Sequence, residues 1–184
     1  MSEHASEVVI LAEDQEHHNL VWHSLRNCAQ YRRRMGRVRK VALPGSRGSG
    51  SQYVREQVPV QVAACRARRA RTLLLVVTDA DNLTAAGREQ TLHDELARAG
   101  REPVADEEMV IIFVPKRQVE TWDRCLLGQP VREDDPDPDR PPVAAGEITT
   151  AAGALYDWAR PNAAVGATCV ESLRAALPRW SRVG

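Results

Sequence analysis

Two aspartates directly follow a stretch of sequence that is suited only to burial. The segment "LLLVVTDADNL" (73–83) places Asp79 and Asp81 after five apolar residues and a threonine, with only Ala80 between the two acids. Carboxylates this close repel each other, and burial raises the cost of their charge. A divalent cation relieves the repulsion, and Mg²⁺ and Mn²⁺ both prefer carboxylate oxygens as ligands. The pair therefore predicts a site for Mg²⁺ or Mn²⁺.

A third acid stands at the end of another apolar run. "EVVILAED" (7–14) rises in hydrophobicity and then ends in Glu13 and Asp14. If both runs are parallel strands of one sheet, Glu13 would join Asp79 and Asp81 at the same edge. A metal held there could neutralise phosphate charge and lower the pKa of a bound water. The alternative is that these acids cap the following helices or face solvent.

The elements that must position these acids alternate along the chain. Strands are expected at residues 7–14, 37–44, 72–79 and 108–115, and helical patterns at 15–30, 49–70, 84–100 and 119–128. We expect serines to begin the second helix, Pro59 to bend or divide it, Thr84 to cap the third helix and Gly100 to end it. Apolar strands alternating with helices predict an α/β fold with a mostly parallel sheet of about four strands and helices on both faces.

Ligands of such sheets bind beyond the carboxyl ends of the strands. "PKRQVE" brings Lys116, Arg117 and Glu120 to this edge after the fourth strand. Trp122 follows them, and we expect it to anchor its helix in the core.

The chain divides by composition into three parts. Residues 1–128 form the expected α/β core, and residues 129–146 are acidic and proline-rich, as in a linker or loop. Residues 147–184 form a helical C-terminal extension that apolar side chains would dock onto the core: Leu155, Trp158, Leu173, Leu177 and Trp180.

The composition indicates a cytoplasmic protein. No apolar run approaches the ~20 residues that span a bilayer, and "MSEHASE" lacks the features of a signal peptide. The four cysteines are far apart and form no CxxC pair, so we interpret them as small hydrophobic side chains in a reducing compartment.

The net charge of zero conceals a strong asymmetry. Residues 24–71 hold 13 Arg and Lys against one acid, Glu56, whereas the rest of the chain holds 12 basic and 24 acidic residues. A basic surface of this kind suits an anionic partner, nucleic acid foremost, although a solvated arginine-rich face is an equal alternative. The basic runs precede the second and third strands, so part of this charge is expected opposite the metal edge and would serve assembly.

The acids and their framework resemble the Toprim family, which includes topoisomerases, bacterial primases, nucleases of the overcoming-lysogenization-defect type and recombination-repair proteins. The resemblance rests on "ILAED" at the end of the first strand and "VVTDAD" after the third, and it covers roughly residues 7–127. "PKRQVETWDRCLL" is also similar to a segment of small Toprim-like proteins from bacterial defence and restriction-associated loci.

The resemblance implies roles for individual residues. Glu13, Asp79 and Asp81 would bind the metal, with Glu13 also acting as general base. Lys116 or Arg117 would contact the phosphate, and Glu120 would be an auxiliary acid. The family's first acid is usually followed by glycine, whereas Asp14 follows here. Asp14 either joins the metal site or marks a divergent, inactive centre.

A loop rich in glycine and serine precedes the second helix. "PGSRGSGSQYVR" (44–55) could hold an anion, with Arg47 and Arg55 facing phosphate, or it could be a plain connector. It is not an ATP-binding loop, because Ser51 stands where the phosphate-gripping lysine is required. An ATPase partner would therefore be a separate subunit.

Two further patterns are weaker. "TDADNLT" is similar to the nucleophile loop of haloacid-dehalogenase-like phosphatases, but Leu83 stands where Thr or Val is expected. His17, His18 and His23 cluster on the first expected helix, and the spacing of His18 and His23 does not share a helix face. We interpret the histidines as surface residues near an anionic substrate rather than as zinc ligands.

The sequence thus supports two hypotheses. The first is a metal-dependent nuclease, a hydrolase acting on DNA or RNA, with an antiviral defence role by analogy. The second is a non-catalytic module that keeps the fold and docks nucleic acid or protein through its basic face. Under both, we expect no membrane partner and leave self-association open.

Overall fold

A four-stranded, all-parallel sheet forms the centre of the computed structural model, which describes residues 5–33, 35–43, 49–68, 70–134 and 141–183. The strand order is β2-β1-β3-β4. The strands are β1 (Glu7–Ala12), β2 (Val38–Lys40), β3 (Thr72–Val77) and β4 (Val110–Phe113). The expected α/β class with a parallel sheet of about four strands is confirmed.

The register of the sheet aligns the carboxyl ends of β1, β3 and β4. Ala12 of β1 lies beside Val77 of β3, and Val77 lies beside Phe113 of β4. The residues that follow these strands therefore emerge at one edge of the sheet. The expected second strand is much shorter than residues 37–44, because Met35–Arg37 form a 3₁₀ turn and only Val38–Lys40 pair with β1.

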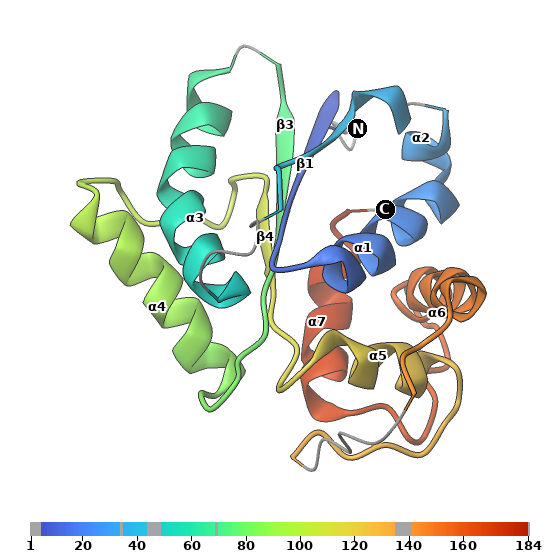
Figure 1. The fold of residues 1–184 in the computed structure, drawn as a ribbon. Helices are drawn as coiled ribbons and strands as arrows, with labels where there is room; N and C mark the ends of the chain where they lie inside the picture. Colours follow the sequence, from blue (N-terminus) through green and yellow to red (C-terminus); the bar gives the residue numbers. More distant parts are fainter. Residues whose placement is uncertain (1–4, 34, 44–48, 69, 135–140, 184) are drawn as a thin grey trace.

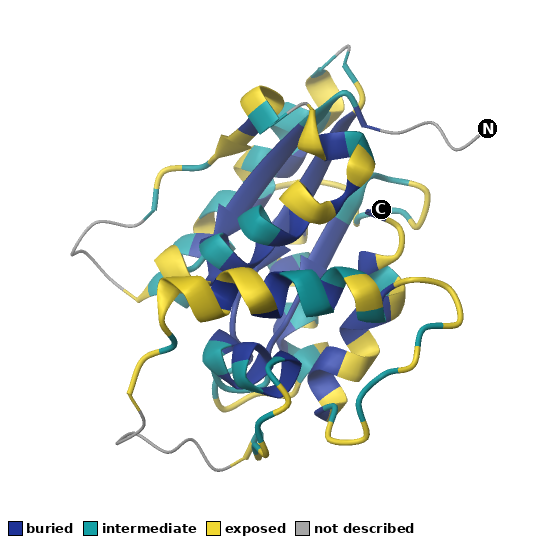
Figure 2. Cartoon of the chain, turned by 90° about the vertical axis from the view of Figure 1, so that its right-hand side faces the viewer, coloured by how far each residue is buried: buried dark blue, intermediate teal, exposed yellow. Residues whose placement is uncertain are grey.

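Helices cover both faces of the sheet (Figure 1). One face carries α3 (Gly50–Ala67) and α4 (Ala85–Arg98). The other face carries five helices: α1 (Gln15–Asn27), α2 (Ala29–Arg32), α5 (Val119–Leu126), α6 (Ala145–Trp158) and α7 (Glu171–Trp180). The strands β1, β3 and β4 are buried between the layers (Figure 2), whereas Arg39 and Lys40 of β2 are exposed. Alternate strand residues face opposite layers, so the continuous apolar runs of β1 and β3 reflect burial on both sides.

The helix ends follow local rules that are visible in the sequence. The side chains of Ser49 and Thr84 cap α3 and α4 by accepting bonds from the backbone N–H groups of Gln52 and Gly87. Gly100 follows α4 with a φ of 65°, a conformation that glycine adopts without strain. Pro59 does not divide α3, which continues through it as one helix while its buried valines hold it against the sheet.

The C-terminal helices complete the core. Leu155, Leu173, Leu177 and Trp180 are buried in the same apolar cluster as the sheet, and Trp158 packs against it half-buried. The ring of Trp180 lies 5.3 Å from that of Phe113, measured between centroids. The docking role expected for these side chains is confirmed.

The outer edge of β4 is engaged by α7. Arg179 donates a hydrogen bond of 3.0 Å to the carbonyl oxygen of Ile112 and forms an ion pair of 2.9 Å with Glu89 of α4. This edge strand is therefore tied to helices of both layers.

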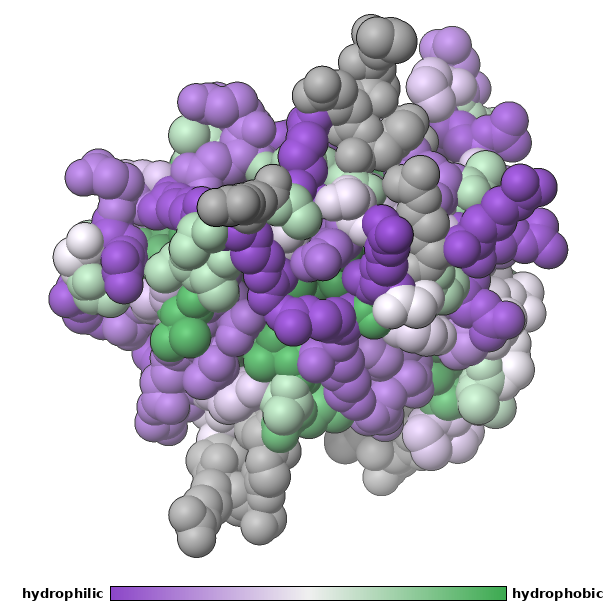
Figure 3. Space-filling view, turned by 90° about the horizontal axis from the view of Figure 1, so that it is seen from above, coloured by the Kyte–Doolittle hydropathy of each residue, from purple (hydrophilic) through white to green (hydrophobic). Residues whose placement is uncertain are grey.

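Part of the basic segment lies at the opposite end of the sheet from Glu13. Arg66 lies in the last turn of α3, Arg68 is the C-cap of this helix, and Arg71 directly precedes β3. Arg66 pairs with Glu108 at 2.7 Å, and Arg68 lies 3.8 Å from Glu7. This end of the molecule is largely hydrophilic (Figure 3).

The cysteines behave as apolar side chains. All four are free thiols, and Cys28 and Cys125 are buried. Burial raises the pKa of the Cys28 thiol to about 12, which keeps it protonated and unreactive. Among the described residues, no helix combines the length and the hydrophobicity that crossing a membrane requires.

Replacing Trp180 by Ala should lower the free energy of unfolding by about 3–5 kcal/mol, because it empties a large buried volume between α7 and the sheet. Chemical denaturation measures this change. Val60→Ala is the matched control on an exposed site, since Val60 is 56% exposed, and its effect should stay within about 0.5 kcal/mol. Equal effects of the two substitutions would show that α7 is not an integral part of the core.

Candidate metal centre

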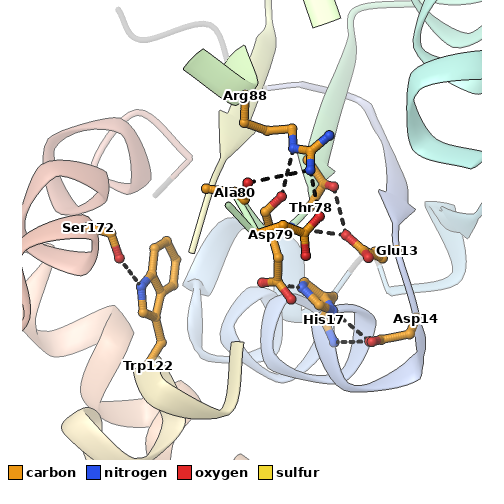
Figure 4. Close-up of polar contacts among 10 residues, drawn as sticks. Glu13, Asp14, His17, Thr78, Asp79, Ala80, Arg88, Trp122 and Ser172 are labelled. Carbon is orange, nitrogen blue, oxygen red and sulfur yellow. Dashed lines mark hydrogen bonds and ion pairs between the residues drawn. The ribbon is translucent and has the colours of Figure 1, made fainter. Parts of the chain in front are cut away.

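Glu13 and Asp79 meet at the carboxyl edge of the sheet. Glu13 directly follows β1, and its Oε2 accepts hydrogen bonds from the Thr78 hydroxyl at 2.8 Å and from the backbone N–H of Asp79 at 3.0 Å (Figure 4). The backbone N–H of Glu13 continues the ladder to Val77. The first acid is therefore fixed to the strand end that carries the second.

His17, from the first turn of α1, completes the group. Its Nε2 lies 2.9 Å from Oδ1 of Asp79, and its Nδ1 lies 2.6 Å from Oδ1 of Asp14 (Figure 4). One ligand atom each from Glu13, His17 and Asp79 lie within 4.8 Å of one another. This buried group could hold a metal ion.

Asp14 acts on His17 rather than on the shared space. It is the N-cap of α1, and its Oδ1 also accepts the backbone N–H of His17 at 3.0 Å. A carboxylate that receives the second ring nitrogen of a histidine ligand fixes its orientation and raises its basicity. Asp14 thus has the geometry of a residue that positions a ligand.

The expectation that the histidines lie on the surface is wrong for two of them. His17 is 1% and His18 8% exposed, because α1 packs its inner face against the sheet and α6. His23 is half-buried. The burial of His17 at the site could have been inferred from its position in the sequence. It lies in the first helical turn after the acid-bearing end of β1, and this places it at the same edge as Glu13.

The surroundings raise the pKa of both Asp79 and His17. Burial raises the pKa of Asp79 to about 6, against the hydrogen bond from His17, and the negative charges of Glu13 and Asp14 add to the increase. Burial alone would lower the pKa of His17, but the hydrogen bonds and charges of Asp14 and Asp79 outweigh it and raise this pKa well above its ordinary value. An imidazolium is therefore the cation among these carboxylates, and a metal ion would displace its proton.

Asp81 is directed away from this group. Its backbone has a φ of 55°, and its carboxylate accepts a 2.6 Å hydrogen bond from Arg88 of α4. Arg88 is buried and also donates to the carbonyl oxygen of Asp79 at 2.8 Å (Figure 4). The structure therefore brings Glu13 and Asp79 together, whereas the carboxylate of Asp81 binds Arg88. Sequence analysis did not identify Arg88, which appears there as an ordinary surface residue of a helix.

The residues after β4 lie at the same edge with partners of their own. Lys116 is 3.7 Å from Asp134, and Arg117 donates to the side chain of Asn82 at 3.1 Å. Nε of Arg117 has no hydrogen-bond partner among the described residues. Glu120 lies half-buried in the first turn of α5. Within the described part of the chain, no hydrogen bond or ion pair links these three residues to the Glu13–His17–Asp79 group.

Asp123 is a buried carboxylate that sequence analysis missed. It is fully buried on α5, and neither of its oxygens has a hydrogen-bond partner among the residues that the structure describes. Burial raises its pKa to about 7, the charge of Glu120 adds to the increase, and the positive charge of His17 opposes it. Asp123 follows Val119 by four residues, so both lie on the buried face of the helix. This spacing is the feature of the sequence that could have indicated its burial.

The first turn of α3 closes the site on the other side. A Cβ on Gly50 would lie 2.2 Å from Cγ and 2.8 Å from the carbonyl oxygen of Glu13, so only glycine fits there. The positive end of the α3 helix dipole is thereby directed at the Glu13 carboxylate. Arg55 is half-buried on α3, and its Nε has no partner among the described residues. Arg47 falls outside the residues that the structure describes.

Comparisons with protein-family models, with curated proteins and with solved structures find no match to this chain.

Substituting Gly50 by Ala should lower the free energy of unfolding by about 1–3 kcal/mol, because the new methyl group must displace Glu13. Denaturant titration measures this, and the same variant should show a smaller thermal shift on addition of Mn²⁺. Gly153→Ala is the control: no atom lies within 4 Å of its added Cβ, so the helix α6 should gain up to about 1 kcal/mol. A neutral Gly50→Ala would contradict the tight contact with Glu13.

The raised pKa of Asp123 gives a stability difference with a defined sign. The unfolded carboxyl ionises near its ordinary pKa of 3.8, whereas the folded one stays neutral until about 7. Asp123 therefore lowers stability progressively as pH rises through that window, by up to about 1.4 kcal/mol per pH unit, and the loss is complete above it.

Asp123→Asn, which cannot ionise, should gain stability relative to the wild type between pH 4.5 and 7.5, measured by thermal unfolding at each pH. The matched control is Asp157→Asn, which removes a carboxylate that is exposed on α6. A flat difference for both variants would mean that Asp123 is solvated.

Proposed function

We propose that this protein is a metal-dependent nuclease that hydrolyses phosphodiester bonds of DNA or RNA, with Glu13, His17 and Asp79 as metal ligands. The observation that carries the proposal is the buried group whose ligand atoms lie within 4.8 Å of one another at the carboxyl edge of a parallel sheet. Active sites of such sheets are built at this edge.

A divalent cation bound there would supply Lewis-acid activation of a phosphodiester. The chain's own residues provide the remaining functions. Asp14 holds the imidazole of His17 in place, and the Thr78 hydroxyl and the Asp79 backbone hold Oε2 of Glu13. Oε1 of Glu13 has no partner among the described residues and could accept the proton of an attacking water. Lys116 and Arg117, which follow β4, would contact the developing phosphate charge.

The ligand set bears on the choice of metal. Two carboxylates and one imidazole suit Mn²⁺ and other transition ions, whereas Mg²⁺ prefers oxygen ligands alone. We therefore favour Mn²⁺ over Mg²⁺ as the ion that supports activity.

The Toprim resemblance supports the same proposal. The acid after β1 and the first acid of the "DAD" segment after β3 lie together, as the resemblance implies for Glu13 and Asp79. Two departures stand beside this agreement: His17 occupies a ligand position, and Asp81 is bonded to Arg88. Within this proposal, an ATPase would act in trans, the protein would work in the cytoplasm, and its pathway would be antiviral defence.

One observation favours a second candidate, a non-catalytic binding or assembly module. His17 already bridges Asp14 and Asp79, so that part of the negative charge is balanced without any metal. A chain that had lost its chemistry could keep this arrangement for stability and use its basic surface for binding.

Metal-dependent thermal stabilisation distinguishes the two candidates. An ion that binds only the native state at a hundred times its Kd adds about 2.7 kcal/mol to stability, so Mn²⁺ should raise the Tm of the wild type by several degrees. Asp79→Asn should abolish the shift and the cleavage of DNA and RNA. Asp81→Asn should retain the shift, because Asp81 contacts Arg88 instead of the ligand group.

The surface variant Asp94→Asn on α4 serves as the control, since its exposed carboxylate accepts a hydrogen bond from Gln90. If neither Mn²⁺, Mg²⁺ nor Zn²⁺ shifts the wild-type Tm, the metal centre is disproved and the binding module is favoured. If Asp81→Asn loses the shift and Asp79→Asn keeps it, the ligand assignment is wrong.

A further inference from the structure

A groove of about 670 Å³ lies beside α1 at some distance from the metal centre. Its walls include Trp22, His23 and Arg26 of α1, Arg32 of α2 and Thr149 of α6. Among the residues that the structure describes, no acidic side chain lines it, although the chain contains 25 acids. The groove therefore presents an aromatic ring among positive charges.

The arginines of this groove are free. Arg26 and Arg32 are both exposed, and within the described residues neither forms an ion pair. Arg66 and Arg68, at the start of the strands, contrast with them because each is paired with a glutamate. The free arginines of the groove carry charge that an anionic ligand could use.

His18 and Trp22 lie one helical turn apart on α1, and Arg26 follows Trp22 by one further turn. Each of these neighbouring pairs can therefore make contact along the helix. The rings of His18 and Trp22 are stacked, with centroids 5.7 Å apart and an interplanar angle of 26°. This contact holds the half-buried indole in place, about 6 Å along the helix axis from Arg26.

We propose that this groove binds single-stranded nucleic acid, with an unpaired base on Trp22 and backbone phosphates on Arg26 and Arg32. Aromatic side chains that stack bases, combined with a basic groove that follows the backbone, are the physical basis of single-strand binding. A duplex cannot use Trp22 in this way, because its bases are already paired and stacked. The inference rests on the proposed function and deepens it by naming its substrate class.

Binding to a dye-labelled oligothymidylate of about 16 nucleotides, followed by fluorescence anisotropy in EDTA, tests the groove without any metal chemistry. Trp22→Ala should weaken binding about tenfold through lost stacking, whereas Trp22→Phe should keep most of the affinity. Arg26→Ser and Arg32→Ser should each weaken binding and reduce the slope of log K against log salt by about 0.7. Arg101→Ser, an exposed arginine after α4, is the control and should leave binding unchanged.

Several outcomes would overturn the inference. These are wild-type affinity in Trp22→Ala, equal affinity for a duplex of the same length, or an unchanged salt slope in both arginine variants. Trp22→Phe and the exposed Arg26→Ser guard against a Trp22→Ala variant that fails to fold.

The test is separable from that of the metal centre. Asp79→Asn should bind the oligonucleotide in EDTA as the wild type does. Binding that depends on the groove, without cleavage under any metal, would refute the nuclease and retain the groove. Metal-dependent cleavage that is unaffected by substitution of Trp22, Arg26 and Arg32 would support the nuclease and refute the groove.

Discussion

The site depends on the repulsion between carboxylates that a parallel sheet gathers at one edge. Glu13 and Asp79 emerge from neighbouring strands in register, and Asp14 contacts the other ring nitrogen of His17, so three acids lie around one imidazole. Such a concentration of negative charge is stable only beside a cation. In the structure the cation is His17, bonded to both Asp14 and Asp79. Proton and metal ion therefore compete for one position, and this competition links the stability of the fold to the chemistry we propose.

A second cation resolves the same problem for the rest of the loop. The buried Arg88 binds the carboxylate of Asp81 and the backbone of Asp79, so it neutralises one acid of the "DAD" pair while fixing the other. The two aspartates are neighbours in sequence but belong to different electrostatic groups. Asp79 therefore contacts α1 on one face of the sheet through His17, and Asp81 contacts α4 on the other face through Arg88.

Sequence reasoning captured the features that depend on periodicity and local chemistry. It predicted the parallel α/β sheet, the caps of Ser49 and Thr84, and the burial of Trp180, because these follow from apolar patterns and short-range bonds. It placed Glu13 at the same edge as Asp79 by the same logic. It could not foresee that Arg88 would bind Asp81, since that contact depends on the turn at a φ of 55°.

The hydrogen bond from Arg179 to the carbonyl oxygen of Ile112, on the outer edge of β4, affects how copies of this chain can associate. An edge strand with open carbonyl and N–H groups invites a neighbouring molecule to lengthen the sheet. Here a second molecule that paired with β4 would first have to remove the Arg179 guanidinium from Ile112 and break its contact with Glu89. At the other end β2 offers only three residues, Val38–Lys40. Growth into a continuous intermolecular sheet is therefore blocked on one side and poorly templated on the other.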